Sequence, residues 1–218
     1  YRDALQFWQE IDAENLLAGI RINIGLAEKY LGNWDAANDN YLEALAICQD
    51  LGNLGWTART LGNLGGLFIA QQSWGKAQHY LILGLGILEK HEIQEFEADL
   101  KSHLALAEYG LGNHEKAVHL AIEAVKLADA KSSLTDRATA RRILGQINAS
   151  QGEYDAALEN LAESQRILEE LGIQHLLAGT LYQQAVAQKL ANKRADAIET
   201  SLRAVTIFRE LEAKPDLQ

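Results

Sequence analysis

The chain repeats itself every 40 residues, and this period limits its possible folds more than any other feature of the sequence. Aligned at that shift, four columns keep their character through five units without an insertion. One column is Ala37, Ala77, Ala117, Ala157 and Ala197, and a second is Ala18, Ala58, Ala98, Ala138 and Ala178. A third holds small residues, namely Gly25, Gly65, Ala105, Gly145 and Ala185. A fourth is apolar and consists of Ile47, Ile87, Leu127, Ile167 and Ile207.

Each unit is predicted to form two helices, a helix A followed by a helix B. In the second unit we expect helix A over 54–71 and helix B over 73–90, with Ser73 as its N-cap. Asn33 and Asn113 are predicted to cap the equivalent helices with their side chains. Small residues at fixed offsets allow the two helices to cross closely. Because no stretch shows sustained strand-like alternation, the fold class is all-α.

We predict one continuous array of five repeats, over 14–53, 54–93, 94–133, 134–173 and 174–213. A single hairpin cannot bury its apolar face alone, so stability comes from stacking neighbours, and Leu104→Asp is predicted to unfold the array. Residues 1–13 resemble the second half of a helix B from a preceding repeat, because Tyr1 and Ala4 match Tyr41 and Ala44. We therefore expect a fragment of a longer protein, with 214–218 as a tail.

The columns resemble the tetratricopeptide repeat over essentially the whole chain. The first unit supplies Ile24, Gly25, Gly32, Trp34, Ala37, Tyr41 and Ala44, and the fourth supplies Leu144, Gly145, Gly152, Tyr154, Ala157, Leu161 and Ser164. The common repeat has 34 residues and often a closing Pro, whereas this chain has a period of 40 and no such Pro. The long form is similar to repeats of kinesin light chains, spindle-orientation adaptors and arms of bacterial signalling ATPases and transcription regulators. The resemblance implies a right-handed superhelical solenoid of antiparallel helix pairs.

The resemblance also implies that helix A lines a concave surface that binds an extended peptide. Asn23 and Asn63 are the leading candidates, since an amide both donates to and accepts from a peptide backbone. The alternative is that these side chains are solvated or bond to the neighbouring helix. The register also predicts Ile22, Gly62 and Ser102 to be exposed. The candidate binding residues are Asn23, Lys29, Arg59, Asn63, Asp99, His103, Tyr109, Arg142, Gln146, Tyr182 and Gln183.

Several other residues have two interpretations. Gly62 and Gly66 either let a ligand approach the backbone of helix A or pack tightly against an adjacent helix. Trp34 and Trp74 are interpreted as core residues. Cys48 is predicted to be a small buried hydrophobe, in one column with Leu88, Ala128, Leu168 and Phe208. The basic residues Lys131, Arg137, Arg141 and Arg142 either receive an acidic partner or, as we favour, are neutralised by Asp and Glu of adjacent helices.

The composition limits the compartment and the partners. A single Cys cannot form an internal disulfide, which favours a reducing, cytoplasmic location. The longest apolar run, 80–88, is far shorter than the roughly 20 residues of a membrane helix, and no signal-peptide pattern precedes it. A formal net charge of −10 and the lack of aromatics among the basic residues argue against nucleic-acid binding. We therefore predict a soluble protein with a protein or peptide partner, no nucleic acid and no membrane.

Nothing in the sequence suggests catalysis, and no cofactor or metal is predicted. His114 and His119 are five residues apart, so their imidazoles do not share a helix face as in a zinc-protease motif. His79 and His119 lie one repeat apart, and helices packed about 8–10 Å apart hold them too distant to chelate one ion easily. No nucleophile with an adjacent base is recognisable. The leading hypothesis is a protein-interaction scaffold with a peptide or partner helix in its groove. The alternative is a sensor or oligomerisation arm of a multidomain signalling ATPase or transcription regulator, in which the array self-associates.

Overall fold

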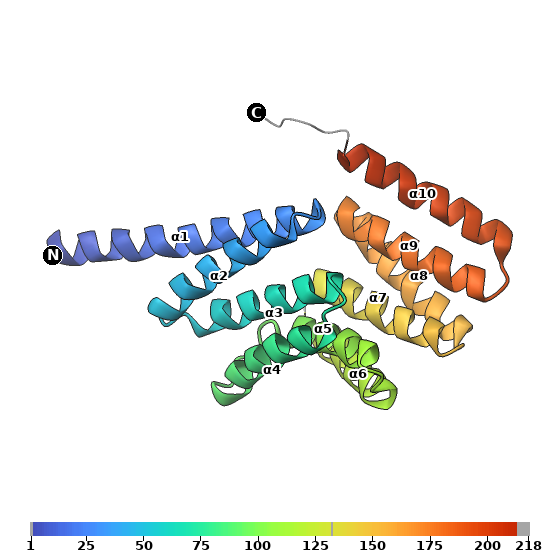
Figure 1. Ribbon diagram of the computed structural model, residues 1–218, viewed down its shortest axis with the longest axis horizontal. Coiled ribbons are helices and arrows are strands. Elements are labelled where there is room, and N and C mark those ends of the chain that lie inside the picture. Colours follow the sequence, from blue (N-terminus) through green and yellow to red (C-terminus); the bar gives the residue numbers. More distant parts are fainter. Residues whose placement is uncertain (1, 132, 213–218) are drawn as a thin grey trace. The chain divides into compact units, whose positions relative to one another are not determined.

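The computed structural model describes residues 2–131 and 133–212, with side chains for 13–131 and 133–211. These residues form ten α-helices and contain no strand (Figure 1). The chain divides into two units, 1–112 and 113–218. Unit 1 contains α1 (Arg2–Tyr30), α2 (Trp34–Asp50), α3 (Leu54–Ala70), α4 (Trp74–Lys90) and α5 (Glu97–Gly110). Unit 2 contains α6 (His114–Ala130), α7 (Leu134–Ser150), α8 (Tyr154–Leu171), α9 (Gln174–Leu190) and α10 (Arg194–Glu212).

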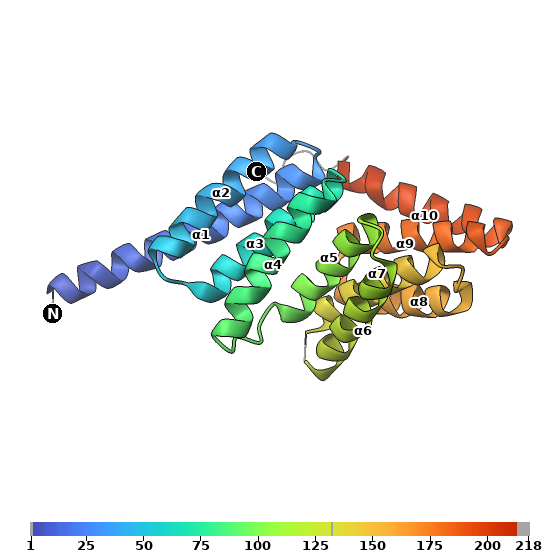
Figure 2. The same cartoon turned by 60° about the horizontal axis from the view of Figure 1, so that its bottom comes forward.

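Consecutive helices pack as antiparallel pairs, and each pair packs against the next helix of its unit. In unit 1, α1 pairs with α2 and α3 with α4, while α5 packs against both α3 and α4. In unit 2, α7 pairs with α8 and α9 with α10, and α6 packs against α7. Figure 2 shows these pairs from a second direction. The all-α fold of consecutive helix pairs predicted from the repeat is confirmed. The third predicted repeat, 94–133, contributes α5 to unit 1 and α6 to unit 2.

The turn from helix A to helix B has the same backbone in every pair that contains it. Gly32, Gly112 and Gly152 have positive φ, between 79° and 87°. Gln72 and Asn192 hold the equivalent positions with φ of 56° and 59°, a left-handed conformation that costs a residue with a side chain about 1 kcal/mol or more. The turns therefore share a left-handed backbone at this position, whether or not the residue is glycine.

The predicted cap positions are right, but the predicted capping bonds are not. Asn33, Ser73 and Asn113 are the N-cap residues of α2, α4 and α6, yet none of their side chains makes the cap hydrogen bond. The side chains of Asn53 and Ser133 do make this bond: each accepts from the backbone N–H of the residue three positions later. Both of these stand at the start of an A helix. The Asn33 amide instead donates to Glu28 at 2.7 Å.

Close helix crossings explain the small column. A Cβ built on Gly65 would lie 2.5 Å from Cγ of Leu81, and one on Gly145 would lie 2.7 Å from Cγ of Leu161. Gly25 similarly leaves room for the ring of Tyr41. Because these neighbours are themselves buried, a methyl group at any of the three positions would displace a core side chain.

Of the two adjacent apolar columns on the B helices, the one that contains Cys48 is more deeply buried than the one that contains Ile47. In the Ile47 column only Ile167 is fully buried. The next column is more deeply buried, as predicted for Cys48, which is 1% exposed. Its last member, Phe208, is 42% exposed, so the core prediction is wrong there. It is also wrong for Trp34, which is 43% exposed, whereas Trp74 is half-buried.

Two assignments at the ends concern residues that are described only in part. The backbone of α1 continues without a turn from Arg2 into the predicted first repeat. Side chains of 1–12, and the whole of the predicted tail 214–218, lie outside the described residues. The assignment of 1–13 to a preceding repeat stays a prediction.

Candidate functional site

Helix α3 is covered on all but one side. It packs against α1, α2, α4 and α5. Between Trp56 and Gly66, every residue is buried except four, which are half-buried at spacings of three and four residues. That spacing places them in one stripe along the helix. The stripe consists of Trp56, Arg59, Asn63 and Gly66.

Residues of α1 and α5 extend this stripe into a continuous surface, which we name the A-helix face of unit 1. The Trp56 ring lies against Gly19 of α1, 3.2 Å from where a Cβ would stand. The same face contains predicted site residues from all three A helices. It consists of Gly19, Asn23 and Lys29 from α1, Trp56, Arg59, Asn63 and Gly66 from α3, and Asp99 and His103 from α5.

Two aromatic rings hold the guanidinium of Arg59 on the A-helix face. Its carbon lies 5.4 Å from the centre of the Trp56 ring and 5.6 Å from that of Phe96. Phe96 is the N-cap residue of α5 and has a left-handed backbone, with φ of 63°. Both distances are within the range of cation–π attraction. Arg59 is thus a positioned cation rather than a freely moving one.

Lys29 and His103 meet across Gly66. A Cβ built on Gly66 would lie 3.7 Å from Nζ of Lys29 and 3.7 Å from Nε2 of His103. Nδ1 of His103 is 3.0 Å from the backbone oxygen of Asp99, and because a carbonyl oxygen only accepts, Nδ1 carries the proton. The Asp99 carboxylate is 3.4 Å from the same nitrogen. Asp99 therefore orients the imidazole with Nε2 toward the exposed backbone of Gly66.

Gly62 and Gly66 of α3, for which the sequence left two interpretations open, have different surroundings in the structure. A Cβ on Gly62 would lie 2.7 Å from Leu100, so Gly62 serves tight packing against α5. Gly66 has only ordinary contact distances around it and lies on the A-helix face. The predicted exposure of Ile22, Gly62 and Ser102 is wrong, because all three are buried, with Ile22 only 2% exposed. The Ser102 hydroxyl donates to the Ala98 carbonyl at 2.8 Å.

Asn23 and Asn63 occupy equivalent positions on α1 and α3, one exposed and one half-buried. Among the described residues, neither side chain hydrogen-bonds to a neighbouring helix. His103 is the third member of this row. Tyr109 is half-buried in the last turn of α5, at the position equivalent to Lys29 of α1. The row places three groups able to bond a peptide backbone on successive A helices of unit 1.

The remaining predicted site residues belong to unit 2. Arg142 and Gln146 are half-buried on α7, and Gln183 is half-buried on α9. Tyr182, also on α9, is 56% exposed. The two helices pack against each other, so the four residues form a second, separate set. The described residues of unit 2 include no counterpart to the arrangement of Lys29 and His103 around Gly66.

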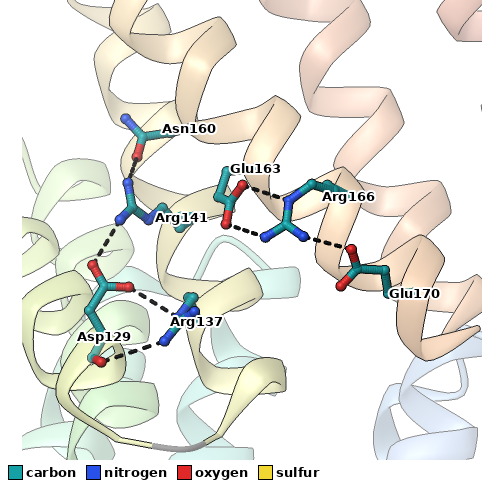
Figure 3. Close-up of polar contacts among 7 residues, drawn as sticks. All are labelled: Asp129, Arg137, Arg141, Asn160, Glu163, Arg166 and Glu170. Carbon is teal, nitrogen blue, oxygen red and sulfur yellow. Dashed lines mark hydrogen bonds and ion pairs between the residues drawn. The ribbon is translucent and has the colours of Figure 1, made fainter.

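Two members of the basic cluster, Arg137 and Arg141, pair with Asp129 of the adjacent helix α6, in line with the interpretation favoured from the sequence (Figure 3). Arg141 donates to Asp129 at 2.8 Å and to Asn160 at 3.3 Å. Nε of Arg137 is 3.1 Å from the Asp129 carboxylate, an ion pair without hydrogen-bond geometry.

A second ion-pair network lies next to this cluster in Figure 3. Arg166 binds Glu163 at 2.8 Å and Glu170 at 2.6 Å. The hydrogen bond from Arg166 holds the pKa of Glu163 below its ordinary value, with help from the charges of Arg141 and Arg137. Arg137 and Arg141 of α7 thus contact α6 and α8, whereas Arg166 pairs with carboxylates of its own helix, α8.

Two cavities lie elsewhere on the surface. One of about 540 Å³ is formed at the junction of α4 and α5, next to Ile93 and Glu97. Another of about 540 Å³ lies beside α10, lined by Leu177, Leu202 and Ile207 among others. Neither includes a residue of the A-helix face of unit 1.

Helix pairs of this kind, repeated with a fixed period and a small-residue crossing, define a class of helical repeat proteins. The sequence profile of the tetratricopeptide repeat matches residues 16–90 and 96–170. The chain belongs to the tetratricopeptide repeat family. Repeats of this family are in general a protein-interaction fold without catalytic activity. A search of curated protein sequences found no match.

Solved structures of three proteins share the fold. BtubC of P. vanneervenii is 19% identical, with a TM-score of 0.66 over 100% of this chain and 90% of that one. A Rap protein in complex with the competence and sporulation factor is 20% identical, with a TM-score of 0.77 over 91% of this chain and 55% of its own. A signal-transduction ATPase of Pyrococcus horikoshii with a tetratricopeptide repeat sensor is 18% identical, with a TM-score of 0.62 over 86% of this chain and 29% of its own. At these identities the likeness concerns the fold alone.

In the described part of the chain, no helix combines the length and apolar character needed to span a membrane. No three His, Cys, Asp or Glu side chains in that part are grouped so that they could hold a metal ion.

Proposed function

We propose that this chain is a protein-interaction scaffold that binds a peptide or a partner helix on the A-helix face of unit 1. The observation that carries the proposal is the row formed by Asn23, Asn63 and His103 on three successive A helices. Side chains that both donate and accept can bind the main chain of an extended segment with little dependence on its sequence. Arg59, held between Trp56 and Phe96, adds a charged anchor beside the row.

The family and one structural neighbour support this proposal. Tetratricopeptide repeats are in general interaction modules, and the Rap protein was solved with the competence and sporulation factor bound. The Arg142, Gln146, Tyr182 and Gln183 set of unit 2 is a second candidate contact for the same partner. Its involvement, the cytoplasmic location and the absence of catalysis stay predictions from the sequence.

A capture experiment tests the proposal with two charge-matched variants. The face variant is Arg59→Glu/Asn63→Asp, and the control is Gln49→Glu/Lys90→Glu, on exposed positions of α2 and α4. Each changes the net charge by −3, so a general electrostatic effect would alter both. We expect proteins captured from native lysate of the source organism by the wild type to be retained by the control and lost by the face variant. Equal retention by all three baits, with circular dichroism confirming that each is folded, would place binding elsewhere.

A second candidate function, self-association as part of an oligomerisation arm, rests on a different observation. Leu168 of α8 is 1% exposed and Leu177 of α9 is 4% exposed, because these helices pack against each other. Their counterparts in the repeat, Phe208 of α10 and Leu17 of α1, are 42% and 44% exposed. The α1 helix of a second copy could therefore pack on α10 as α9 packs on α8. A molar mass that rises with concentration and falls back for Phe208→Glu would support this; a constant monomer mass would exclude it.

A further inference from the structure

The junction between α4 and α5 departs from the other junctions between a helix B and the next helix A. Helices α3, α7 and α9 begin at equivalent positions, namely Leu54, Leu134 and Gln174. The period therefore places the start of α5 at residue 94, but α5 begins at Glu97 and the segment 91–96 is a loop (Figure 2). The cavity of about 540 Å³ at this junction is within the size range of ligand sites.

The lining of this cavity is apolar with an excess of carboxylates. It includes the aliphatic residues Leu85, Leu88 and Ile93 and the charged residues Glu89, Glu92, Glu97 and Lys101. Lys101 pairs with Glu97 at 3.2 Å. The carboxylates of Glu89 and Glu92 are exposed, and neither makes an ion pair or a hydrogen bond within the described part of the chain. The C-terminal end of α4 adds the negative end of a helix dipole. The cavity therefore suits a group that combines an apolar stem with a positive charge.

Glu92 occupies its position at a conformational cost. Its φ is 54°, and the equivalent residues of two other junctions are Gly52 and Gly172, with φ of 65° and 68°. Glycine adopts this left-handed conformation easily, whereas a residue with a Cβ is strained in it. The exposed side chain of Glu92 makes no bond to another described residue that would offset the strain. A strained residue without a structural partner motivates a functional hypothesis for its side chain.

We propose that the cavity between α4 and α5 binds an arginine side chain of a partner protein. The methylene groups of the arginine pack on the aliphatic lining, as such stems do on apolar surfaces. Its guanidinium presents five donors in a planar fork and bonds the carboxylates of Glu89 and Glu92. Hydrogen bonds between charged groups are about twice as strong as those between neutral groups. The inference is independent of the proposed peptide site, because no residue of the A-helix face of unit 1 lines this cavity.

Three short peptides that differ at one position test this inference. Each is an acetylated and amidated run of alanines with arginine, citrulline or leucine in the middle. Citrulline has nearly the shape of arginine but no charge, so the difference between the two reports the charge. Two-dimensional NMR of the nitrogen-15-labelled protein follows the backbone amides during each titration. We expect the arginine peptide to shift amides within 85–101 and to bind about tenfold more tightly than the citrulline peptide.

Two results of these titrations would overturn the arginine site. Equal affinity for the arginine and citrulline peptides would show that the carboxylates do not recognise a charge. Tighter binding of the leucine peptide than of the arginine peptide would assign the cavity to an apolar side chain instead.

A double variant separates the binding of arginine from the stability of the fold. Glu89→Gln/Glu92→Gly removes both carboxylates and introduces the residues of the equivalent positions in the first repeat, Gln49 and Gly52. Because glycine relieves the strain, the melting temperature should rise while the preference for arginine over citrulline is lost. Asp39→Asn/Asp50→Asn is the control, because it removes the same charge from exposed positions of α2 and should leave the preference unchanged. A preference that persists in the folded double variant, or that is lost equally in the control, would contradict the arginine site.

Discussion

Arg141 donates a hydrogen bond of 3.3 Å to Asn160, and three repeats earlier Arg21 donates one of 3.1 Å to Asn40. In both pairs the Asn amide also donates to the carbonyl four residues before it. The bond joins helix A to helix B within one hairpin. The two sites differ in burial, because Asn160 is 8% exposed while Asn40 is half-buried.

This difference predicts unequal costs for the same substitution. Asn160→Ala removes a buried bond to a charged group and should lower the free energy of unfolding by about 1–2 kcal/mol. Asn40→Ala should cost about half of that, since water can replace the lost partner of Arg21 more easily. Urea denaturation of both variants measures the difference. A larger loss for Asn40→Ala would show that burial does not set the value of this bond.

Leu100 is wedged between two glycines, which makes Gly62 sensitive to substitution. A Cβ on Gly62 would lie 2.7 Å from one methyl of Leu100, and a Cβ on Gly84 would lie 2.6 Å from the other. Gly62→Ala should therefore destabilise the protein by about 1–3 kcal/mol, despite the better helix propensity of Ala. Gly66→Ala, one turn later, should stabilise it by up to about 1 kcal/mol. Thermal denaturation followed by circular dichroism compares them, and equal shifts would refute the packing difference.

Tyr41 is fully buried, and its hydroxyl has no hydrogen-bond partner among the described residues. Removing that hydroxyl should help, so Tyr41→Phe is expected to raise the free energy of unfolding by about 1 kcal/mol near pH 7. Urea denaturation of the wild type and the variant checks this. A loss of stability would indicate that water or another group satisfies the hydroxyl.

The same residue predicts a dependence on alkaline pH. Burial, and to a lesser degree Tyr30, raises the pKa of Tyr41 well above its ordinary value. The unfolded state then binds fewer protons than the folded state above about pH 10, so stability falls there by about 1.4 kcal/mol per pH unit. Tyr41→Phe should remove this slope. Burial, offset in part by a hydrogen bond with Thr60, also raises the pKa of the Cys48 thiol, so a weaker decline from about pH 8.5 should remain in both proteins.

Unit 1 contains a buried and an exposed leucine at which the same substitution can be compared to test the packing of the core. Leu104 of α5 is 5% exposed and Leu83 of α4 is 46% exposed. Leu104→Asp would bury an unpaired carboxylate, at a cost of several kcal/mol, and should unfold at least unit 1. Leu83→Asp should leave the melting temperature nearly unchanged. A folded Leu104→Asp protein with the wild-type melting temperature would contradict the packing described above.

The sequence predicted the helix positions well because the 40-residue period fixes them. The B helices begin at Trp34, Trp74, His114, Tyr154 and Arg194, one repeat apart. The exception is α5, which begins at Glu97 after Phe96 takes a left-handed conformation. No column reveals this local departure, because it concerns one residue, Phe96, whose ring lies 5.6 Å from the guanidinium carbon of Arg59.

Burial was harder to predict, because it depends on which neighbour lies opposite. Trp74 packs on Gly110, where a Cβ would overlap its ring. The position equivalent to Gly110 in the preceding repeat is Ala70, which has a methyl group, and there the equivalent Trp34 is 43% exposed. Ile22 and Ser102 were expected on the surface but are buried. The A helices pack side by side so closely that only one stripe of α3 stays partly exposed. The sequence indicated Asn63, Lys29 and His103 as site residues, but not that the latter two meet over Gly66.

The most direct test of the account is photocrosslinking from two defined positions. The photoreactive residue p-benzoylphenylalanine replaces either Asn23, exposed on the A-helix face of unit 1, or Leu83, exposed on α4. Each protein is irradiated in native lysate, and adducts are identified by mass spectrometry. We predict adducts with one partner from position 23 and none with that partner from position 83. Adducts from position 83 with none from position 23 would contradict the binding surface proposed here.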